Sequence, residues 1–324
     1  MRSPIAVAAP VAVVAPAVFA AFWFFGSGGG QDGELPAVLL PPEPAIGGAV
    51  PVSFTSPAEP PQPVPDCGPD VSAEFLEQNQ IVSYYGNPYV PAMGILGELE
   101  PDELIARVKA HAEKYDTLNG ARGVQPALHM VYASAQPEPG PDGLHLIFVD
   151  RRTVNQYINL ACKHGFLVFL DVQLGRSDVA AEVTDMLTYL QLPHVHASLD
   201  PEFAMRPGEV PGEAIGTVDA TEINEAQRIL EAFVLERGLP DKMLIVHQFT
   251  DGMVTRPELI QDYARVRLVI DMDGFGPAEI KQVKFGWYAA TAEYSGIKLF
   301  FKQDGDLMRE EDVLKLEPDV IIHQ

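Results

Sequence analysis

From about Val71 to the C-terminus, apolar runs of strand length alternate with segments of helical periodicity. This alternation predicts a parallel sheet covered by helices, because parallel strands need long crossover connections. Eight strands within residues 71–324 fit a single α/β domain, a (β/α)8 TIM-like barrel, with an open doubly wound sheet as the alternative. The expected strands are Ile81–Tyr85, Ala127–Ala133, Phe166–Val172, Val195–Asp200, Met243–Phe249, Arg267–Met272, Ile297–Lys302 and Asp319–His323.

Between these strands, apolar residues at helical spacing predict the covering helices. Asp219 and Glu222 have the spacing of a capping box at the start of one of them. The last strand ends at the terminus, so its helix is either missing or replaced by Val71–Gln78. The count of eight strands would rise if an extra strand forms at Ala214–Val218 or His145–Val149. The apolar stripes are Leu104, Val108, Ala112 and Tyr115; Val179, Val183, Leu187 and Leu190; and Ile223, Ala226, Leu230 and Phe233, with a further helix expected over Glu279–Glu293.

The N-terminal 70 residues have a different composition. Pro4–Phe25 is apolar and uncharged and is long enough to cross a membrane, so residues 1–25 are expected to be a signal-anchor or a signal peptide. Residues 26–70 are rich in Gly and Pro and are expected to form a disordered linker. We therefore expect an exported protein, anchored in the membrane with its barrel outside the cytoplasm, or secreted if the segment is cleaved.

The charge of the chain argues against a nucleic-acid-binding protein, and its two cysteines argue against a disulfide-rich or zinc-finger protein. The chain has 22 basic and 45 acidic residues and a formal net charge of -23, which opposes binding to nucleic acid. Cys162 is expected to be a small apolar residue on a helix, with a disulfide to Cys67 as the alternative outside the cytoplasm. No phosphate-binding or dinucleotide-binding glycine motif is present, and no cofactor is expected.

The stretch from His194 to Phe203 resembles a buried strand that ends in two carboxylates, Asp200 and Glu202. Residues two apart on a strand point to the same side, so both acids can face one site. Pro201 cannot donate a ladder hydrogen bond, and the strand is expected to stop there.

In a barrel, the C-terminal ends of all strands meet at one mouth, where active sites lie. The residues at these ends are acids, amides and aromatics, which supply general acids, hydrogen bonds to sugar hydroxyls and stacking faces. Glycoside hydrolysis needs one protonated and one ionised carboxyl group. The candidate catalytic residues are Glu202 as the acid, Asp171 or Asp271 as nucleophile, base or charge stabiliser, and Asp200. The candidate substrate-binding residues are Tyr84, Tyr85, His129, Tyr132, Gln173, His247, Gln248, Asp273, Gln303 and Gln324.

A metal-dependent hydrolase is a further possibility. His194 and His196 have the spacing of paired metal ligands, but they begin their strand and would lie at the wrong mouth. His129, His247 and His323 lie near the favoured mouth and could bind a metal together with Asp171 or Asp271. The sequence nevertheless contains no established metal motif, so no metal ligand is assigned.

From about Ile81 to Gln324, the chain resembles glycoside-hydrolase-type TIM barrels and uncharacterised exported barrel proteins of bacterial cell envelopes. This resemblance implies an envelope-tethered glycoside hydrolase acting on a cell-wall or extracellular polysaccharide. The alternative is a non-catalytic barrel that binds glycan or has a structural role in the envelope. The resemblance rests on Ser83-Tyr84-Tyr85-Gly86, Phe169-Leu170-Asp171-Val172-Gln173, Leu199-Asp200-Pro201-Glu202-Phe203, Val246-His247-Gln248-Phe249 and Ile322-His323-Gln324.

Overall fold

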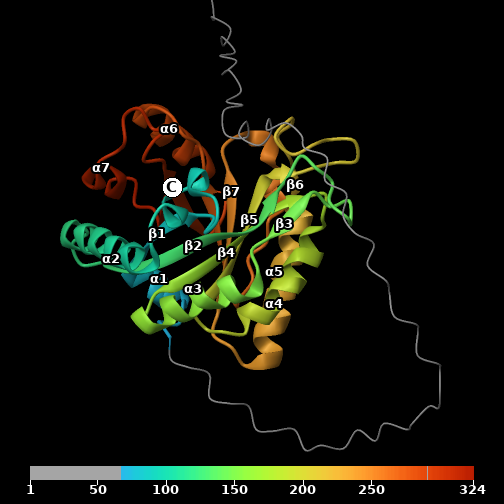
Figure 1. The fold of residues 1–324 in the computed structure, drawn as a ribbon. Helices are drawn as coiled ribbons and strands as arrows, with labels where there is room; N and C mark the ends of the chain where they lie inside the picture. The colour runs from blue at the N-terminus through green and yellow to red at the C-terminus, as the bar shows by residue number, and fades with distance from the viewer. Residues whose placement is uncertain (1–66, 290) are drawn as a thin grey trace, which may run out of the picture. The chain divides into compact units, whose positions relative to one another are not determined.

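A closed barrel of eight parallel strands forms the centre of the computed structural model, which describes residues 67–289 and 291–324 (Figure 1). The strand order is β1-β2-β4-β5-β7-β9-β10-β11, and β1 pairs with both β2 and β11, which closes the sheet. The predicted (β/α)8 barrel is therefore confirmed, and the open sheet is excluded.

The predicted membrane or signal segment and nearly all of the predicted linker lie outside the described residues. Among the described residues, no helix has both the length and the apolar character needed to cross a bilayer. Residues 67–70, which we assigned to the linker, belong to the folded region, since Cys67 is buried there.

All eight predicted strands are present. Two short strands, β6 and β8, pair only with each other, and β3 runs antiparallel to β2 at its end. The strands are β1 (Asn79–Gly86), β2 (Gly123–Ala135), β3 (Leu146–Phe148), β4 (Leu167–Gly175), β5 (Val195–Ala204), β6 (Val218–Asp219), β7 (Lys242–Gln248), β8 (Val254–Thr255), β9 (Val266–Met272), β10 (Tyr294–Leu299) and β11 (Val320–His323).

The prediction that β5 stops at Pro201 is wrong. Asp200 pairs with Gln173 and Ala204 pairs with Gly175, so three residues of β5 bulge against one of β4. Pro201 lies in this bulge, where its missing N–H removes no ladder hydrogen bond. The strand therefore carries Glu202 past the proline at the mouth of the barrel.

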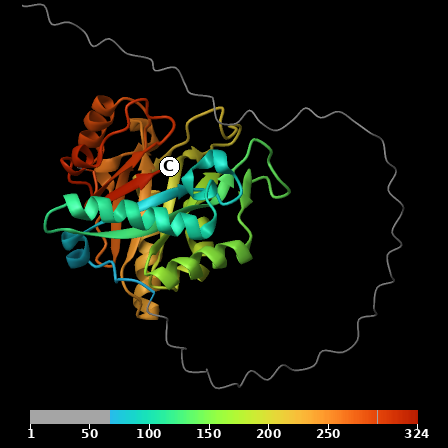
Figure 2. The same ribbon diagram turned by 60° about the vertical axis from the view of Figure 1, so that its left-hand side comes forward.

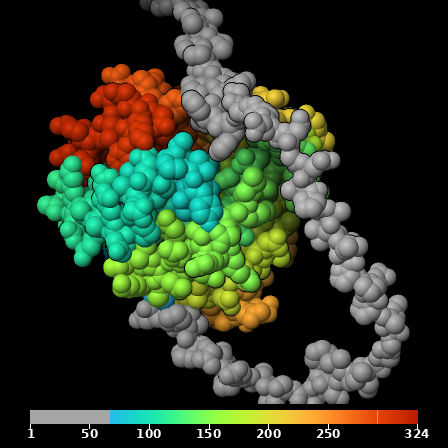
Figure 3. Space-filling model, viewed as in Figure 1, coloured from blue at the N-terminus to red at the C-terminus, as the bar shows by residue number. Residues whose placement is uncertain are grey.

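Six helices cover the outside of the barrel, and Figure 2 shows α2 lying across the strands. At the surface, α2 and α3 lie side by side (Figure 3). Between β7 and β9 the described chain has no α-helix, only the short strand β8 and the 3-10 turns Asp251–Met253 and Pro257–Leu259, and α5 packs against both strands. The predicted capping box at Asp219 and Glu222 is present. The helices are α1 (Ala73–Gln78), α2 (Pro101–Leu118), α3 (Arg151–His164), α4 (Val179–Leu190), α5 (Ala220–Arg237), α6 (Ala278–Tyr288) and α7 (Glu310–Leu314), with 3-10 turns also at Pro91–Met93 and Ile95–Gly97.

Alternate residues of the strands build two separate apolar clusters. The larger lies between the strands and the outer helices, and the smaller fills the barrel interior with residues such as Phe169, Met243 and Ile322. Because side chains alternate along a strand, each strand that feeds the interior cluster also aims its last inward residue at the C-terminal mouth.

Helix α1 closes the N-terminal end of the barrel, so of the two alternatives, the one in which this segment replaces the last outer helix is wrong. Val71 and Leu76 belong to the interior apolar cluster. The chain ahead of α1 is fixed by a disulfide between Cys67 and Cys162 of α3, at a sequence separation of 95 residues. Cys162 is thus a cross-link rather than a plain apolar packing residue.

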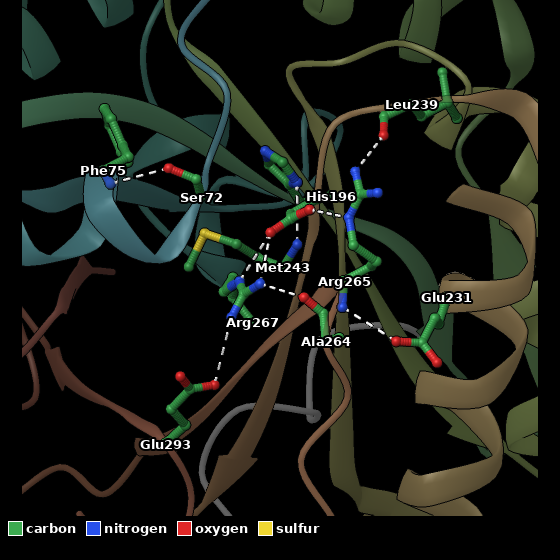
Figure 4. A network of polar contacts seen from close by, with 11 residues as sticks. Ser72, Phe75, His196, Glu231, Leu239, Met243, Ala264, Arg265, Arg267 and Glu293 are labelled. Carbon is green, nitrogen blue, oxygen red and sulfur yellow. Dashed lines mark hydrogen bonds and ion pairs between the residues drawn. The ribbon is translucent and has the colours of Figure 1, made fainter. Parts of the chain in front are cut away.

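A network of charges surrounds the same end, at the starts of β7 and β9 (Figure 4). Asp241 forms ion pairs with Arg265 and Arg267, and Arg267 also donates to the Ala264 carbonyl. The ammonium of Lys242 donates to the carbonyls of Leu192, Pro193 and Val195 at 2.7, 3.1 and 3.0 Å. Hydrogen bonds thus compensate the buried charge at this end.

Candidate active site

The opposite, C-terminal end of the barrel contains a polar cluster made by inward-facing side chains of seven strands. Burial is nearly complete for all of its members except Glu202, which is partly exposed. We call this set the mouth cluster. It consists of Tyr85 of β1, His129 of β2, Asp171 of β4, Ser198, Asp200 and Glu202 of β5, His247 of β7, Asp271 of β9 with the following Asp273, and Lys298 of β10.

His247 is the centre of the mouth cluster. Its Nδ1 lies 2.9 Å from Asp271 Oδ2 and 3.5 Å from Asp273 Oδ2. Its Nε2 lies 3.2 Å from Ser198 Oγ and 3.5 Å from Asp171 Oδ1. Burial by itself lowers the pKa of this imidazole, but hydrogen bonds with Asp171 and Asp271 raise it well above the usual value. The ring therefore bridges the carboxylate of Asp171 on β4 and those of Asp271 and Asp273 at the end of β9.

Lys298 supplies the second cation. Its Nζ lies 3.2 Å from Asp273 Oδ2 and 3.5 Å from the centre of the Tyr85 ring, a cation–π contact. Burial lowers the pKa of this ammonium, yet the carboxylates around it, Asp273 first among them, raise it overall. Lys298 is therefore charged and pairs with Asp273.

Tyr85 connects the lysine to the interior carboxylate. Its hydroxyl donates to Asp171 Oδ2 at 2.9 Å. Burial raises the pKa of Asp171, but hydrogen bonds from His247 and Ser198 and the charge of His247 lower it below its usual range. Asp171 is thus ionised, fully buried and engaged by its neighbours.

The two carboxyl groups of β5 differ from Asp171. Burial, and then the charge of Glu202, raise the pKa of Asp200 well above its usual value. Burial, and then the charge of Asp273, raise the pKa of Glu202 to about 7. Glu202 therefore carries a proton near neutral pH while Asp273 beside it is paired with Lys298. A carboxyl group with a raised pKa and an ion-paired carboxylate are thus present at one mouth.

Two groups of donor atoms in the mouth cluster are close enough to bind a metal ion. One consists of His129, Asp171 and His247, and the other of His247, Asp271 and Asp273, with the donor atoms of each group within 4.8 Å of one another. A third such group, Cys67, Cys162 and His194, contains the disulfide, so its sulfurs are not free to bind.

Many of the residues predicted from the sequence lie in the mouth cluster. All four candidate catalytic residues are there, together with Tyr85, His129, His247 and Asp273 from the substrate-binding set. His194 and His196 lie at the other end, as expected, where His196 Nδ1 accepts a hydrogen bond from the Met243 amide.

Two aromatic residues of the predicted set lie outside the barrel. Tyr84 contacts His111, Phe301 and His323 in the layer between strands and helices, because it points to the opposite side from Tyr85. Tyr132 packs against Phe148 and Tyr189. The structure therefore does not bring either ring into the mouth cluster.

The predicted amides also lie elsewhere. Gln173 is buried, and its Oε1 accepts from the Ala135 amide. Gln248 follows His247 and so points away from the side of the strand that His247 uses. Gln303 is exposed, because β10 ends at Leu299 rather than Lys302. Gln324 continues the ladder beside β10, its amide donating to the Leu299 carbonyl.

The sequence analysis missed Lys298 and Ser198. Lys298 was inside a predicted strand, and its spacing from Tyr294 and Gly296 places all three on one side. Gly296 lies beside Asp271, and a Cβ at this glycine would be 2.7 Å from Asp271 Oδ1. A glycine and a lysine two residues apart, on the same side of one predicted strand, were the sequence feature that could have identified Lys298 as a site residue.

Comparisons with known proteins add little to this geometry. No protein-family model matches the chain, and neither does any curated protein. Among solved structures, the chain is similar to 2,3-dimethylmalate lyase, a PEP mutase/isocitrate lyase superfamily member, with 12% identity over 77% of this chain and 78% of that chain and a TM-score of 0.45. It is also similar to a chitinase from Chromobacterium violaceum, with 12% identity over 73% of this chain and 75% of that chain and a TM-score of 0.38.

A third similar structure is N-acetylneuraminate lyase from Aliivibrio salmonicida, with 10% identity over 76% of this chain and 69% of that chain and a TM-score of 0.37. The similar structures thus include both lyases and a glycoside hydrolase. At these identities and TM-scores, none of them bears on the reaction of this chain.

Proposed function

We propose that this chain is a glycoside hydrolase that uses Glu202 as its general acid and Asp273 as its ionised carboxylate. The observation that carries the proposal is the contrast between these two groups at one mouth. Burial raises the pKa of Glu202 to about 7, whereas Asp273 is held in an ion pair by Lys298 at 3.2 Å. Glycoside hydrolysis needs this pairing of a protonated and an ionised carboxyl group.

Asp273 replaces Asp171 and Asp271 as the partner of Glu202. The side chains of Asp171 and Asp271 are fully buried beside His247, at 3.5 and 2.9 Å. They hold the imidazole in place and are positioning residues. Asp273 lies at the end of β9 and retains some exposure, as Glu202 does. Both can therefore approach a substrate that enters from the mouth.

We further propose that the substrate is a cell-wall or extracellular polysaccharide and that the protein is exported. The Cys67–Cys162 disulfide supports export, because disulfides persist in oxidising compartments. The apolar run Pro4–Phe25 is consistent with export by a signal-anchor or a signal peptide. The acidic surface does not favour nucleic acid as a ligand.

The test is release of reducing sugar from a panel of polysaccharides by the full chain and its Glu202→Gln variant. We expect the variant to lose about 100- to 10,000-fold in rate, the contribution of a general acid. For the unmodified chain, kcat/KM should fall above pH about 7, since Glu202 then loses its proton. Glu77→Gln, an exposed change in α1 at the other end of the barrel, is the matched control.

Two results would count against this assignment. Full activity in a folded Glu202→Gln variant would exclude Glu202 as the acid. Binding of a glycan by the unmodified chain, without any release of sugar and with equal affinity in the variant, would favour the non-catalytic glycan-binding barrel.

A further inference from the structure

Deeper in the barrel than Glu202, three side chains from separate strands converge on one point. His129 of β2, Asp171 of β4 and His247 of β7 each offer a donor atom, and the three atoms lie within 4.8 Å of one another. All three residues are 0% exposed. The glycosidase proposal does not require His129, so this convergence needs a separate explanation.

His129 has no hydrogen-bond partner for either ring nitrogen among the described residues. The rings of Tyr85, Phe169 and His247 surround it, at centroid distances of 4.9, 5.3 and 5.4 Å. An imidazole buried in this way without a partner is costly, and buried polar groups in folded proteins nearly always have one. The unpaired nitrogens therefore point to a ligand inside the barrel.

His247 is oriented as metal-binding histidines are. Such a histidine usually holds one ring nitrogen on a carboxylate and presents the other to the ion. Here Nδ1 lies 2.9 Å from Asp271 Oδ2, and Nε2 points to Asp171 Oδ1 at 3.5 Å. Gly296 leaves the room that Asp271 needs, since a Cβ there would lie 2.7 Å from its Oδ1.

Asp171 is arranged in the same way. Its Oδ2 accepts the hydroxyl of Tyr85 at 2.9 Å, which leaves Oδ1 facing the two histidines. A hydrogen bond to one carboxylate oxygen fixes the direction of the other, as in the outer shell of a metal site.

The charge of the surroundings also suits a cation. Three carboxylates, those of Asp171, Asp271 and Asp273, lie within 3.5 Å of His247, and Lys298 pairs with Asp273. A doubly charged ion between these side chains would lie next to several carboxylates and would be attracted by them. Two imidazole nitrogens and one carboxylate oxygen suit Zn²⁺ and similar ions better than Mg²⁺ or Ca²⁺, which prefer oxygen ligands.

We propose that His129, Asp171 and His247 bind one divalent first-row transition-metal ion, such as Zn²⁺, inside the barrel beneath the mouth. Asp271 and Tyr85 orient the ligands, and Lys298 stays outside the ligand set. This inference goes beyond the proposed hydrolase, because the site is separate from Glu202 and its occupancy is measured without any substrate.

The experiment is elemental analysis of the full chain, purified without chelator and without a histidine tag, followed by titration with Co²⁺ after chelation. We expect roughly one transition-metal ion per chain and visible Co²⁺ absorption bands that Zn²⁺ displaces. His129→Phe keeps an aromatic ring in the pocket and should weaken Co²⁺ binding by at least about 100-fold. Asp271→Asn should weaken it by about 10- to 100-fold, and serves as the second variant if His129→Phe does not fold.

The matched control is His323→Phe. His323 is equally buried but lies outside the barrel, stacked on Phe301 with ring centroids 5.2 Å apart. Its replacement should leave Co²⁺ binding unchanged. The proposal is overturned if the unmodified chain neither retains a metal nor binds Co²⁺, or if His129→Phe and Asp271→Asn bind Co²⁺ as tightly as the control. Either result leaves the role of Glu202 untouched, since that role is measured by sugar release.

Discussion

The two ends of the barrel use the same kinds of charged residue with opposite results. At the N-terminal end, Lys242 donates to three carbonyls, and Asp241 is shared by two arginines. At the C-terminal end, carboxylates outnumber cations, and atoms of His129 and Asp271 lack hydrogen bonds among the described residues. One ring nitrogen each of His194 and His196 at the N-terminal end also lacks a partner among the described residues, so the two ends differ mainly in the excess of buried carboxylates. Such uncompensated buried charge is typical of sites where ligands bind.

The compensated charges at the N-terminal end suit a role in stability, and the excess of carboxylates at the C-terminal end suits the binding of a ligand. In TIM barrels the N-terminal end generally carries stability and the C-terminal end carries the active site. Changes at the two ends should therefore have separable effects on the free energy of unfolding and on activity. Three changes test this separation.

The largest effect is expected at the N-terminal end, from replacing Cys67 and Cys162 together by alanine. The disulfide closes a loop across 95 residues of sequence, and its loss should lower the free energy of unfolding by about 4 kcal/mol. Urea denaturation of both proteins measures the difference. Reductant should destabilise the unmodified chain to the same extent and leave the variant unchanged; equal stability of the two proteins without reductant would contradict the prediction.

Asp241→Ala should have the next largest effect. It removes the carboxylate partner of Arg265 and leaves Arg267, whose side chain is only 10% exposed, with the longer contact to Glu293 at 3.7 Å. Removing one partner of a largely buried ion pair costs about 3 kcal/mol. Thermal unfolding should show this loss, while sugar release per folded molecule stays the same. Asp262→Ala, at an exposed position, is the control, and an equal loss in that control would refute a special role for Asp241.

The smallest effect, with the opposite sign, is expected at the mouth. The pKa of Glu202 is about 7 in the folded chain against an ordinary value of 4.5, so the unfolded state loses this proton first. The unmodified chain therefore loses stability as pH rises from 4.5 to about 7. Glu202→Gln does not titrate and should be more stable above pH about 7, by at most about 3 kcal/mol.

Unfolding measured at several pH values checks this last prediction. The two proteins should differ little below the ordinary pKa of a glutamate, and their difference should grow toward neutral pH. Identical pH profiles for the variant and the unmodified chain would mean that Glu202 is not held protonated, and the separation between the two ends would lose its support at the mouth.

The sequence predicts the barrel well because the strands are continuous apolar runs bounded by polar residues. Phe166–Val172 and Val195–Asp200 are examples, and parallel strands buried on both sides produce this pattern. Chain direction then places Asp171, Asp200 and His247 at one mouth. Recognising the strands and their direction is therefore enough to predict at which end of the barrel the candidate site lies.

The finer geometry was not predictable in the same way. An apolar run does not say which of Tyr84 and Tyr85 faces inward, because both sides of a barrel strand are buried. The end of β10 was placed three residues too late, which favoured Gln303 over Lys298. The ion pair between Lys298 and Asp273 depends on the strand order β9-β10, which no local pattern contains.

The position of the disulfide has a mechanical consequence. Cys67 is joined to α3 before the chain reaches α1 and β1. A pull applied to the chain ahead of Cys67 therefore passes through a covalent bond into a helix of the outer layer. The load on the parallel hydrogen bonds of β1, which hold Tyr85 in place, is therefore smaller than it would be without this covalent bond.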